Sequence, residues 1–430
     1  MTAVPALPLS LPDRPAAPSA RPVAALPLVP EAGTAVGGVP LLELAERYGT
    51  PLHVLDEDEV RSRARAWRRA LPDAEVVYAA GTFLCRAVVD WMAEEGLGLA
   101  VRSAGELELA AARGFPVDRI VLHGSAKSPQ DLRTALRLGV GRIVIESGGE
   151  IARLAAQVPG PEAQQVMVRV LPDIEPTGGA DRTFGLAVAG GDAEEAVARV
   201  LGLPSLELVG LHCRPGTRTA SPERYVRTVR RLVAMLARIR DRHGIALPEL
   251  DLGGGFAVSG PPGDPAPAPA VYGRRIHDEL VRSCAGYDYP VPRLTVEPGR
   301  SLMAPAGVAL YRVLAVKRGG GRVLAAVDGG TGDRPGAALR GTSVRRVGRA
   351  SSAPPRVTTV VGRDGGAGDV LADAVELPED LRPGDVLAVP VSGGCPVPMA
   401  SPVVAVRGGW SRLLVRRETF EDHRRRDIGL

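Results

Sequence analysis

Short apolar runs rich in β-branched residues recur along the first three quarters of the chain, and amphipathic stretches separate most of them. Eight runs follow one another: EVVYAA (75–80), GLGLAVRS (96–103), RIVLHG (119–124), RIVIES (142–147), QVMVRVLP (165–172), LELVGLHC (206–213), ELDLGGGF (249–256) and RLTVEPG (293–299). Strand and helix alternating eight times over about 250 residues predicts a (β/α)8 barrel. A six-stranded doubly wound sheet is the alternative.

Two Ser-Pro pairs, at 128–129 and 221–222, predict where helices begin. Serine suits the N-cap, and proline suits the first turn because its missing N–H has no intrahelical partner there. The stretch DEDEVRSRARAWRRAL after PLHVLD (51–56) also has a helical pattern.

The pattern changes after Arg300, where short strands separated by Gly/Pro turns predict a β-domain. We therefore expect four parts: a disordered Pro/Ala-rich tail at 1–36, a strand at 37–56 that joins the β-domain, the barrel at 57–305 and the C-terminal all-β domain at 306–430.

Composition limits the classes of protein. The chain has 430 residues, of which 45% are apolar but only 3% aromatic, so Val, Leu and Ala must fill the core. No apolar run is long enough to cross a membrane, and no secretory signal is seen, so we expect a cytoplasmic protein. A net charge of +4 with interspersed signs argues against a nucleic-acid partner. The four cysteines are far apart and predict neither a metal site nor disulfides.

Lysine is scarce. Only Lys127 and Lys317 are lysines among the 53 basic residues, and the rest are arginines. Coding from GC-rich DNA explains this bias, but it leaves only two side-chain amines that could bond covalently to a carbonyl group.

Candidate chemistry lies at the predicted strand ends, where barrel enzymes place their active sites. DLGGGF (251–256) could cradle a phosphate with its backbone N–H groups, or could be only a tight turn. EPGR (297–300) offers a carboxylate for a ring nitrogen and a guanidinium for phosphate, or an internal ion pair. In LHCRPGT (211–217), a buried and satisfied His212 is expected; in HGSAKS (123–128), Lys127 is expected to be a solvated loop residue.

Together these segments resemble the diaminopimelate decarboxylase family, the fold-type III, alanine-racemase-like enzymes that depend on pyridoxal phosphate. The resemblance covers roughly residues 38–430 and rests on the order of segments such as TPLHVLDEDEVRSRAR, RIVLHGSAKS, LDLGGGFAV, VEPGRSL, VDGG and LPEDLRPGDVLAVP. It implies a barrel followed by a β-domain, and a head-to-tail homodimer whose active sites are shared across the interface.

The resemblance also implies which residues bind the cofactor. These are Gly253, Gly254, Gly255, Glu297, Arg300, His123 and Thr217. The residues expected in the substrate pocket are Arg102, Arg214, Arg340 and Asp328.

Several positions depart from the family pattern. Gly81 stands where the family has the lysine that holds the cofactor covalently, and Arg214 stands in place of a histidine that stacks on the cofactor ring. Gly365 and Gly366 replace the Cys-Glu pair of a loop that reaches the partner's site.

Three hypotheses follow. The first is a degenerate homologue that binds a small anionic or phosphorylated ligand, with pyridoxal phosphate held non-covalently at best. The second is a repurposed enzyme that uses the same pocket without a covalent lysine, and the third is a pyridoxal phosphate-dependent amino-acid decarboxylase, diaminopimelate to lysine type, with an unusual lysine arrangement. A small-molecule ligand and a homodimer are expected, a heteromer with another protein being the alternative.

Overall fold

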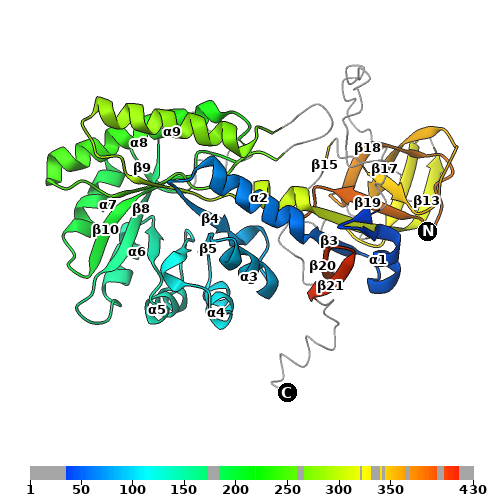
Figure 1. The fold of residues 1–430 in the computed structure, drawn as a ribbon, viewed down its shortest axis with the longest axis horizontal. Helices are drawn as coiled ribbons and strands as arrows, with labels where there is room; N and C mark the ends of the chain where they lie inside the picture. The colour runs from blue at the N-terminus through cyan, green and yellow to red at the C-terminus, as the bar shows by residue number, and fades with distance from the viewer. Residues whose placement is uncertain are drawn as a thin grey trace, which may run out of the picture.

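The computed structural model describes residues 35–172, 184–217, 219–258, 266–319, 322–330, 339–340, 344–363, 368–394 and 401–415. Figure 1 shows two lobes side by side, a larger one built of strands and helices and a smaller one dominated by strands. The predicted disordered tail at 1–36 lies almost wholly outside the described residues, which begin at Ala35.

The larger lobe is a closed parallel barrel. Its eight strands are β4 (Glu75–Ala79), β5 (Gly98–Val101), β6 (Ile120–Leu122), β7 (Arg142–Ile145), β8 (Gln164–Leu171), β10 (Leu206–His212), β11 (Glu249–Asp251) and β12 (Arg293–Val296). The ring closes because β12 pairs with β4 and β8 pairs with β10. The predicted (β/α)8 barrel is confirmed, and closure rules out the open doubly wound sheet. A short extra strand, β9 (Leu186–Ala187), pairs with β8.

Helices surround the barrel (Figure 1); the first leads from β3 (Leu52–Asp56) into β4, and the others connect consecutive barrel strands. They are α2 (Glu57–Ala70), α3 (Arg86–Glu94), α4 (Ala104–Ala112), α5 (Pro129–Leu138), α6 (Gly148–Ala155), α7 (Asp192–Leu201), α8 (Pro222–His243) and α9 (Pro269–Gly286). Ser128 caps α5 in a reciprocal capping box with Asp131, as its position predicts. Ser221 is the N-cap residue of α8, but its side chain makes no capping hydrogen bond.

The smaller lobe contains strands from both ends of the chain. They are β3 (Leu52–Asp56), β13 (Gly307–Gly319), β14 (Arg322–Val327), β15 (Leu339–Arg340), β16 (Arg345–Val347), β17 (Pro355–Val361), β18 (Val370–Pro378), β19 (Val386–Pro390), β20 (Val403–Arg407) and β21 (Trp410–Val415). Strand β3 pairs antiparallel with β13 and parallel with β20, which ties the segment before the barrel into this sheet. Helix α1 (Leu41–Tyr48) and the hairpin β1 (Ala35–Val36) and β2 (Val39–Pro40) complete the lobe, and the short helix α10 (Arg300–Met303) leads into it from the barrel.

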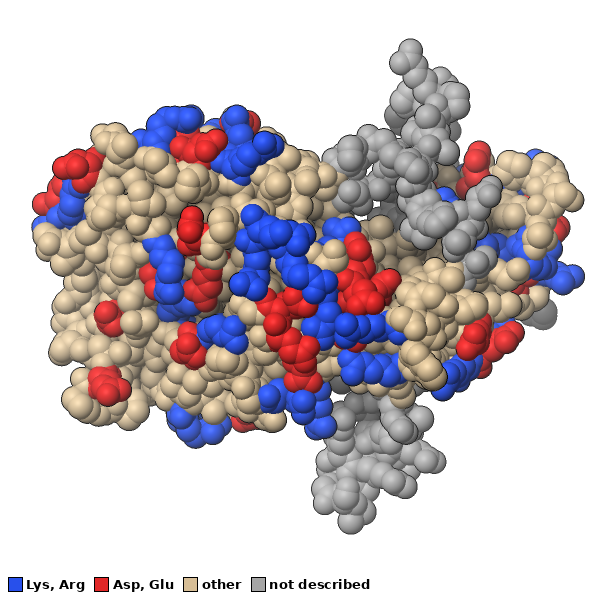
Figure 2. Space-filling view, in the orientation of Figure 1, with Lys and Arg blue, Asp and Glu red and all other residues tan. Residues whose placement is uncertain are grey.

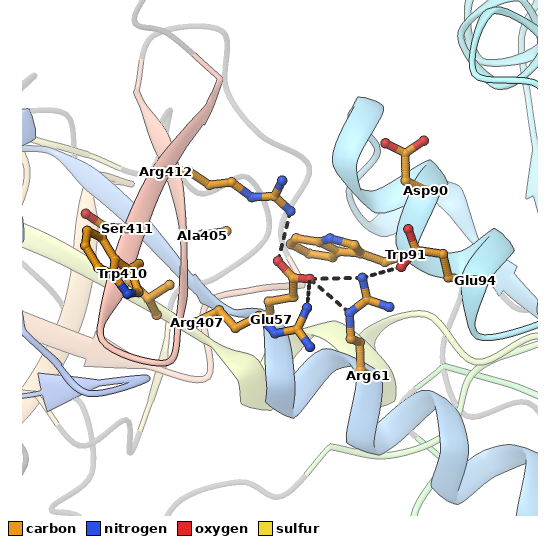
Figure 3. A pocket seen from close by; sticks show the side chains of 11 residues that line it. Glu57, Arg61, Asp90, Trp91, Glu94, Ala405, Arg407, Trp410, Ser411 and Arg412 are labelled. Carbon is orange, nitrogen blue, oxygen red and sulfur yellow. Dashed lines mark hydrogen bonds and ion pairs between the residues drawn. The ribbon is translucent and has the colours of Figure 1, made fainter.

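A buried carboxylate joins the lobes. Glu57, the first residue of α2, accepts hydrogen bonds from Arg61 (2.9 Å), Arg407 (3.0 Å) and Arg412 (2.9 Å). Arg407 and Arg412 come from β20 and β21, so the barrel and the second sheet share this one charge (Figure 3). The contacts line a pocket of about 470 Å³.

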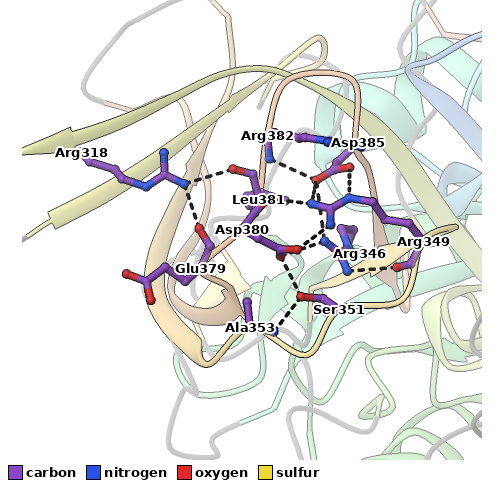
Figure 4. Close-up of polar contacts among 10 residues, drawn as sticks. All are labelled: Arg318, Arg346, Arg349, Ser351, Ala353, Glu379, Asp380, Leu381, Arg382 and Asp385. Carbon is purple, nitrogen blue, oxygen red and sulfur yellow. Dashed lines mark hydrogen bonds and ion pairs between the residues drawn. The ribbon is translucent and has the colours of Figure 1, made fainter.

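A second polar cluster holds loops of the smaller lobe together. Arg349 pairs with Asp385 at 2.9 Å and also with Asp380, and Ser351 donates to Asp380 at 2.8 Å (Figure 4). Hydrogen bonds from Arg349 and Ser351 lower the pKa of Asp380 to about 2. The cluster therefore keeps its ion pairs at any mildly acidic pH.

The outer surface carries both signs of charge. Basic and acidic side chains lie beside one another on the face shown in Figure 2, with no large field of one sign. None of the described helices is both long enough and apolar enough to span a bilayer.

The amino ends of the barrel strands enclose a buried ion-pair network. Arg142, the first residue of β7, donates to Glu75 at 2.6 Å and to Glu249 at 2.9 Å, which begin β4 and β11. Arg142 is only 3% exposed. In barrels this face contributes to stability and not to chemistry.

We predict that Arg142→Met destabilises the protein by about 3–5 kcal/mol, because it leaves two largely buried carboxylates short of a partner. Urea unfolding followed by circular dichroism measures the change. The matched control is Arg356→Met, which removes an exposed surface pair with Glu379 and is expected to cost less than about 1 kcal/mol. Equal losses in the two variants would contradict the assigned role.

Candidate functional site

The carboxyl ends of the strands present polar side chains above an apolar interior. Val77, Ala100, Val121, Val144, Met167 and Val209 form a buried cluster inside the barrel. Side chains alternate along a strand, so residues two positions further point to the same side. On the first five strands these residues are Ala79, Arg102, His123, Glu146 and Arg169. The alternation thus places charged groups at the mouth where barrel chemistry occurs.

Glu297 is the centre of a buried cluster. His123 Nε2 lies 2.6 Å from Glu297 Oε1, and His212 Nε2 lies 3.8 Å from Glu297 Oε2. Glu297 and His123 are each less than a tenth exposed, and the two imidazole rings meet edge to face at 4.9 Å. Because β6, β10 and β12 supply these residues, the ring closure of the barrel brings them together.

The pKa values of the groups in this cluster are shifted in different directions. Burial and the nearby Glu297 charge raise the pKa of Asp251 well above its usual value. Burial also opposes the charge of Glu297, but His123 and His212 outweigh it and hold the Glu297 pKa well below its usual range. Burial lowers the pKa of His212 to about 4. Asp251 is therefore the more readily protonated of the two carboxyl groups, and Glu297 the more readily ionised.

The glycine turn after β11 packs too tightly for any side chain. A Cβ on Gly253 would lie 2.5 Å from the Cys213 carbonyl oxygen, and a Cβ on Gly254 or Gly255 would overlap other backbone oxygens. Gly253 and Gly255 also have positive φ angles, 56° and 103°. Asp251 Oδ1 accepts from the Gly253 N–H at 2.7 Å and so shapes the turn.

The four residues His123, His212, Asp251 and Glu297 each offer a ligand atom within 4.8 Å of the others. A metal ion bonded to two ligands at about 2.0–2.2 Å would hold them roughly 3 Å apart or more. The direct 2.6 Å contact between His123 and Glu297 is too short for an ion between those atoms.

The Arg102 side chain lies where a side chain on residue 81 would lie. Gly81 lies in the turn η1 (Ala80–Thr82) directly after β4, and Arg102 directly follows the neighbouring strand β5. A Cβ built on Gly81 would overlap the guanidinium of Arg102. The Arg102 side chain therefore covers Gly81.

The prediction that Lys127 is a solvated loop residue is wrong. Its side chain is fully buried, and Nζ donates to Glu150 Oε1 at 2.7 Å, to the Gly124 carbonyl at 2.8 Å and to the Val144 carbonyl. Burial lowers its pKa, against the opposing effect of Glu150. Three acceptors use all three ammonium protons, so Lys127 is a structural residue beneath the loop and not an amine presented to the pocket.

The expectation of a satisfied His212 is only half right, because its Nδ1 has no hydrogen-bond partner among the described residues. Arg214 is exposed and donates to Thr217 at 3.3 Å. Asp328 accepts from Thr50 and from the Arg312 N–H (2.8 Å), contacts that serve the second lobe. Arg300 begins α10 after the EPG turn.

Some predicted positions lie beyond the described atoms. Gly365 and Gly366 fall outside the described residues, and Arg340 is described only as part of β15. The place of Arg340 in the substrate pocket and the replacement of the family's Cys-Glu pair by Gly365 and Gly366 stay predictions.

Sequence reasoning missed two contributors to the mouth: Asp251, and the ion pair of Glu146 with Arg169 at 3.6 Å. The signal was present, since Glu146 and Arg169 each stand two positions after an interior apolar residue.

We predict that the free energy of unfolding falls by up to about 3 kcal/mol as pH drops from about 6.5 to about 4, because unfolded His212 binds a proton that the folded side chain rejects. His212→Asn should reduce this slope, measured by urea unfolding at several pH values. His277→Asn, at an exposed position on α9, should leave it unchanged. An unaltered slope in His212→Asn would show that other groups cause the pH dependence.

Comparison with known proteins identifies the class. Residues 57–304 match the family described as pyridoxal-dependent decarboxylase, pyridoxal binding domain. This span is more than half of the chain, and the chain belongs to that family. Within it, the relatives are diaminopimelate decarboxylases. One from Actinosynnema pretiosum subsp. auranticum is 50% identical over 410 residues, covering 91% of this chain and 92% of the relative.

Another, from Mycobacterium tuberculosis, is 38% identical over 416 residues, covering 90% and 93%. The resemblance to the diaminopimelate decarboxylase family is therefore confirmed.

Solved structures agree on the fold. The crystal structure of diaminopimelate decarboxylase from M. jannaschii superposes with a TM-score of 0.81 at 24% identity, covering 89% of this chain and 93% of that one. A structure from Aquifex aeolicus gives a TM-score of 0.81 at 27% identity, covering 92% and 96%.

These relatives bear on the competing hypotheses. They are decarboxylases, so they favour the hypothesis of an amino-acid decarboxylase over that of a degenerate homologue. The degenerate homologue gains no support from them.

Proposed function

We propose that this protein binds pyridoxal phosphate without a covalent bond and decarboxylates an amino acid of the diaminopimelate type. The observation that carries the proposal is the 50% identity to a diaminopimelate decarboxylase over nine-tenths of both chains. The buried cluster around Glu297 supports it, because an ionised carboxylate at this depth suits a protonated ring nitrogen.

Different residues of the chain bind the ring and the phosphate of the cofactor. Glu297 accepts a hydrogen bond from the ring nitrogen, and His123 holds the Glu297 carboxylate in place. The turn 253–255 takes the phosphate, since the described residues offer no acceptor to the N–H groups of Gly254 and Gly255. Pyridoxal phosphate, when bound, supplies the electron sink that decarboxylation requires.

The cofactor's covalent anchor does not fit this chain. Gly81 has no amine, Lys127 is committed to Glu150 and two carbonyls, and Lys317 is exposed on β13 in the second lobe. The unusual lysine arrangement is thus unsupported by geometry, and the substrate amine must meet a cofactor held only by non-covalent contacts. A homodimer, which the family resemblance implies, belongs to the same proposal.

A second candidate is a binding protein that retains the pocket but not catalysis. The observation in its favour is that Arg102 covers Gly81 and Arg214 takes the place of the ring-stacking histidine.

The test combines two measurements. Protein saturated with pyridoxal phosphate is reduced with borohydride and mapped by mass spectrometry, and meso-diaminopimelate is supplied while L-lysine is quantified. We expect no covalent adduct, loss of the cofactor on dialysis, and formation of L-lysine. Cofactor binding without L-lysine would favour the second candidate, and an adduct on Lys127 would overturn the non-covalent arrangement.

Glu297→Gln tests the ring contact, because a neutral amide loses the charge-assisted hydrogen bond. We expect at least a roughly tenfold weaker affinity for pyridoxal phosphate, measured by equilibrium dialysis. The control is Glu108→Gln, at a position on the outer helix α4 where the exposed side chain lies 3.9 Å from Arg137. Equal affinities in wild type and Glu297→Gln would remove Glu297 from the cofactor site.

A further inference from the structure

Arg102 is placed at the barrel mouth by strand geometry. Ala100 belongs to the buried interior cluster, so alternation turns the side chain of Arg102 toward the axis, one layer above. Its backbone is held firmly, since the Arg102 N–H donates to Glu106 Oε2 at 2.6 Å and Ser103 caps α4. The side chain itself is exposed.

Arg102 differs in its pairing from Arg142 and Arg169. Arg142 at the amino face binds two carboxylates, and Arg169 at the mouth pairs with Glu146. Among the described residues, no carboxylate or carbonyl oxygen accepts a hydrogen bond from the Arg102 guanidinium, while its backbone N–H is used. The mouth therefore contains a permanent cation whose five donors meet no carboxylate or carbonyl acceptor in the described part of the chain.

The absence of a side chain at residue 81 leaves room for this guanidinium. A Cβ on Gly81 would overlap the Arg102 guanidinium, the flexible end of that side chain, so a larger residue at position 81 requires Arg102 to move. A guanidinium cannot form the covalent bond that a lysine forms with an aldehyde, but its planar donor fork matches a carboxylate in two parallel hydrogen bonds.

We propose that Arg102 binds a carboxylate of the amino-acid ligand, in the space that a side chain at residue 81 would otherwise fill. The inference rests on the proposed function in that it takes the ligand to be an amino acid bound at the barrel mouth. Arg102 then selects ligands that bear a carboxylate, and the lack of a side chain at Gly81 leaves room for its guanidinium.

The binding test uses two halves of the ligand that cannot be decarboxylated through the cofactor: pimelate, which has only the carboxylates, and cadaverine, which has only the amines. Calorimetry with protein saturated in pyridoxal phosphate is expected to show that Arg102→Gln weakens pimelate binding roughly ten- to a hundredfold and leaves cadaverine unchanged. Arg133→Gln, an exposed arginine on the outer helix α5, is the control and should change neither.

The outcomes separate the two proposals. Unchanged pimelate affinity in Arg102→Gln, or no pimelate binding by wild type, overturns the role of Arg102 even if L-lysine is formed from diaminopimelate. Pimelate binding that depends on Arg102 supports the role even if no L-lysine is formed.

A second test examines the shared space directly. Gly81→Lys alone should give little borohydride-stable adduct with pyridoxal phosphate, because Arg102 blocks the lysine stem, whereas Gly81→Lys with Arg102→Ala should give at least about tenfold more by mass spectrometry. Circular dichroism verifies that both variants fold. Equal labelling of the two would show that Arg102 does not hold this space.

Discussion

Closure of the eight parallel strands is the constraint on which the rest of the structure depends. Hydrogen bonds from β12 to β4 and from β8 to β10 leave no free edge, and each strand must then turn alternate residues toward the axis. Layers follow from this alternation. A polar layer at the amino ends contains Arg142, an apolar layer fills the middle, and a polar layer at the carboxyl ends contains Glu297 and His123.

The two charged layers serve different ends. At the amino face the arginine and the glutamates neutralise one another and are shielded from solvent, which suits stability. At the mouth the balance is incomplete: the pKa of Glu297 is lowered, the pKa of Asp251 is raised, and the Arg102 guanidinium pairs with no carboxylate among the described residues. Strongly shifted pKa values within one site are typical of functional sites.

The proposed mode of ligand binding depends on two neighbouring residues at the barrel mouth, Gly81 and Arg102. Gly81 presents no side chain after β4, and the guanidinium of Arg102, which follows the neighbouring strand β5, fills the space. Family membership shows that the scaffold is that of a pyridoxal-dependent decarboxylase. In the proposed arrangement, charge and hydrogen bonds hold the ligand in that scaffold.

The sequence by itself determined the barrel, the second sheet and the candidate residues Glu297, His123 and Gly253–Gly255, because period-2 runs, serine caps and glycine turns are local signals. It misjudged Lys127, since a lysine beside a helix cap looks solvated until β7 and α6 are seen to supply the Val144 carbonyl and Glu150. Only the tertiary structure decided that Arg102 covers Gly81. Contacts between neighbouring strands depend on register and closure, and residues 21 positions apart in the sequence carry no local sign that they share one space.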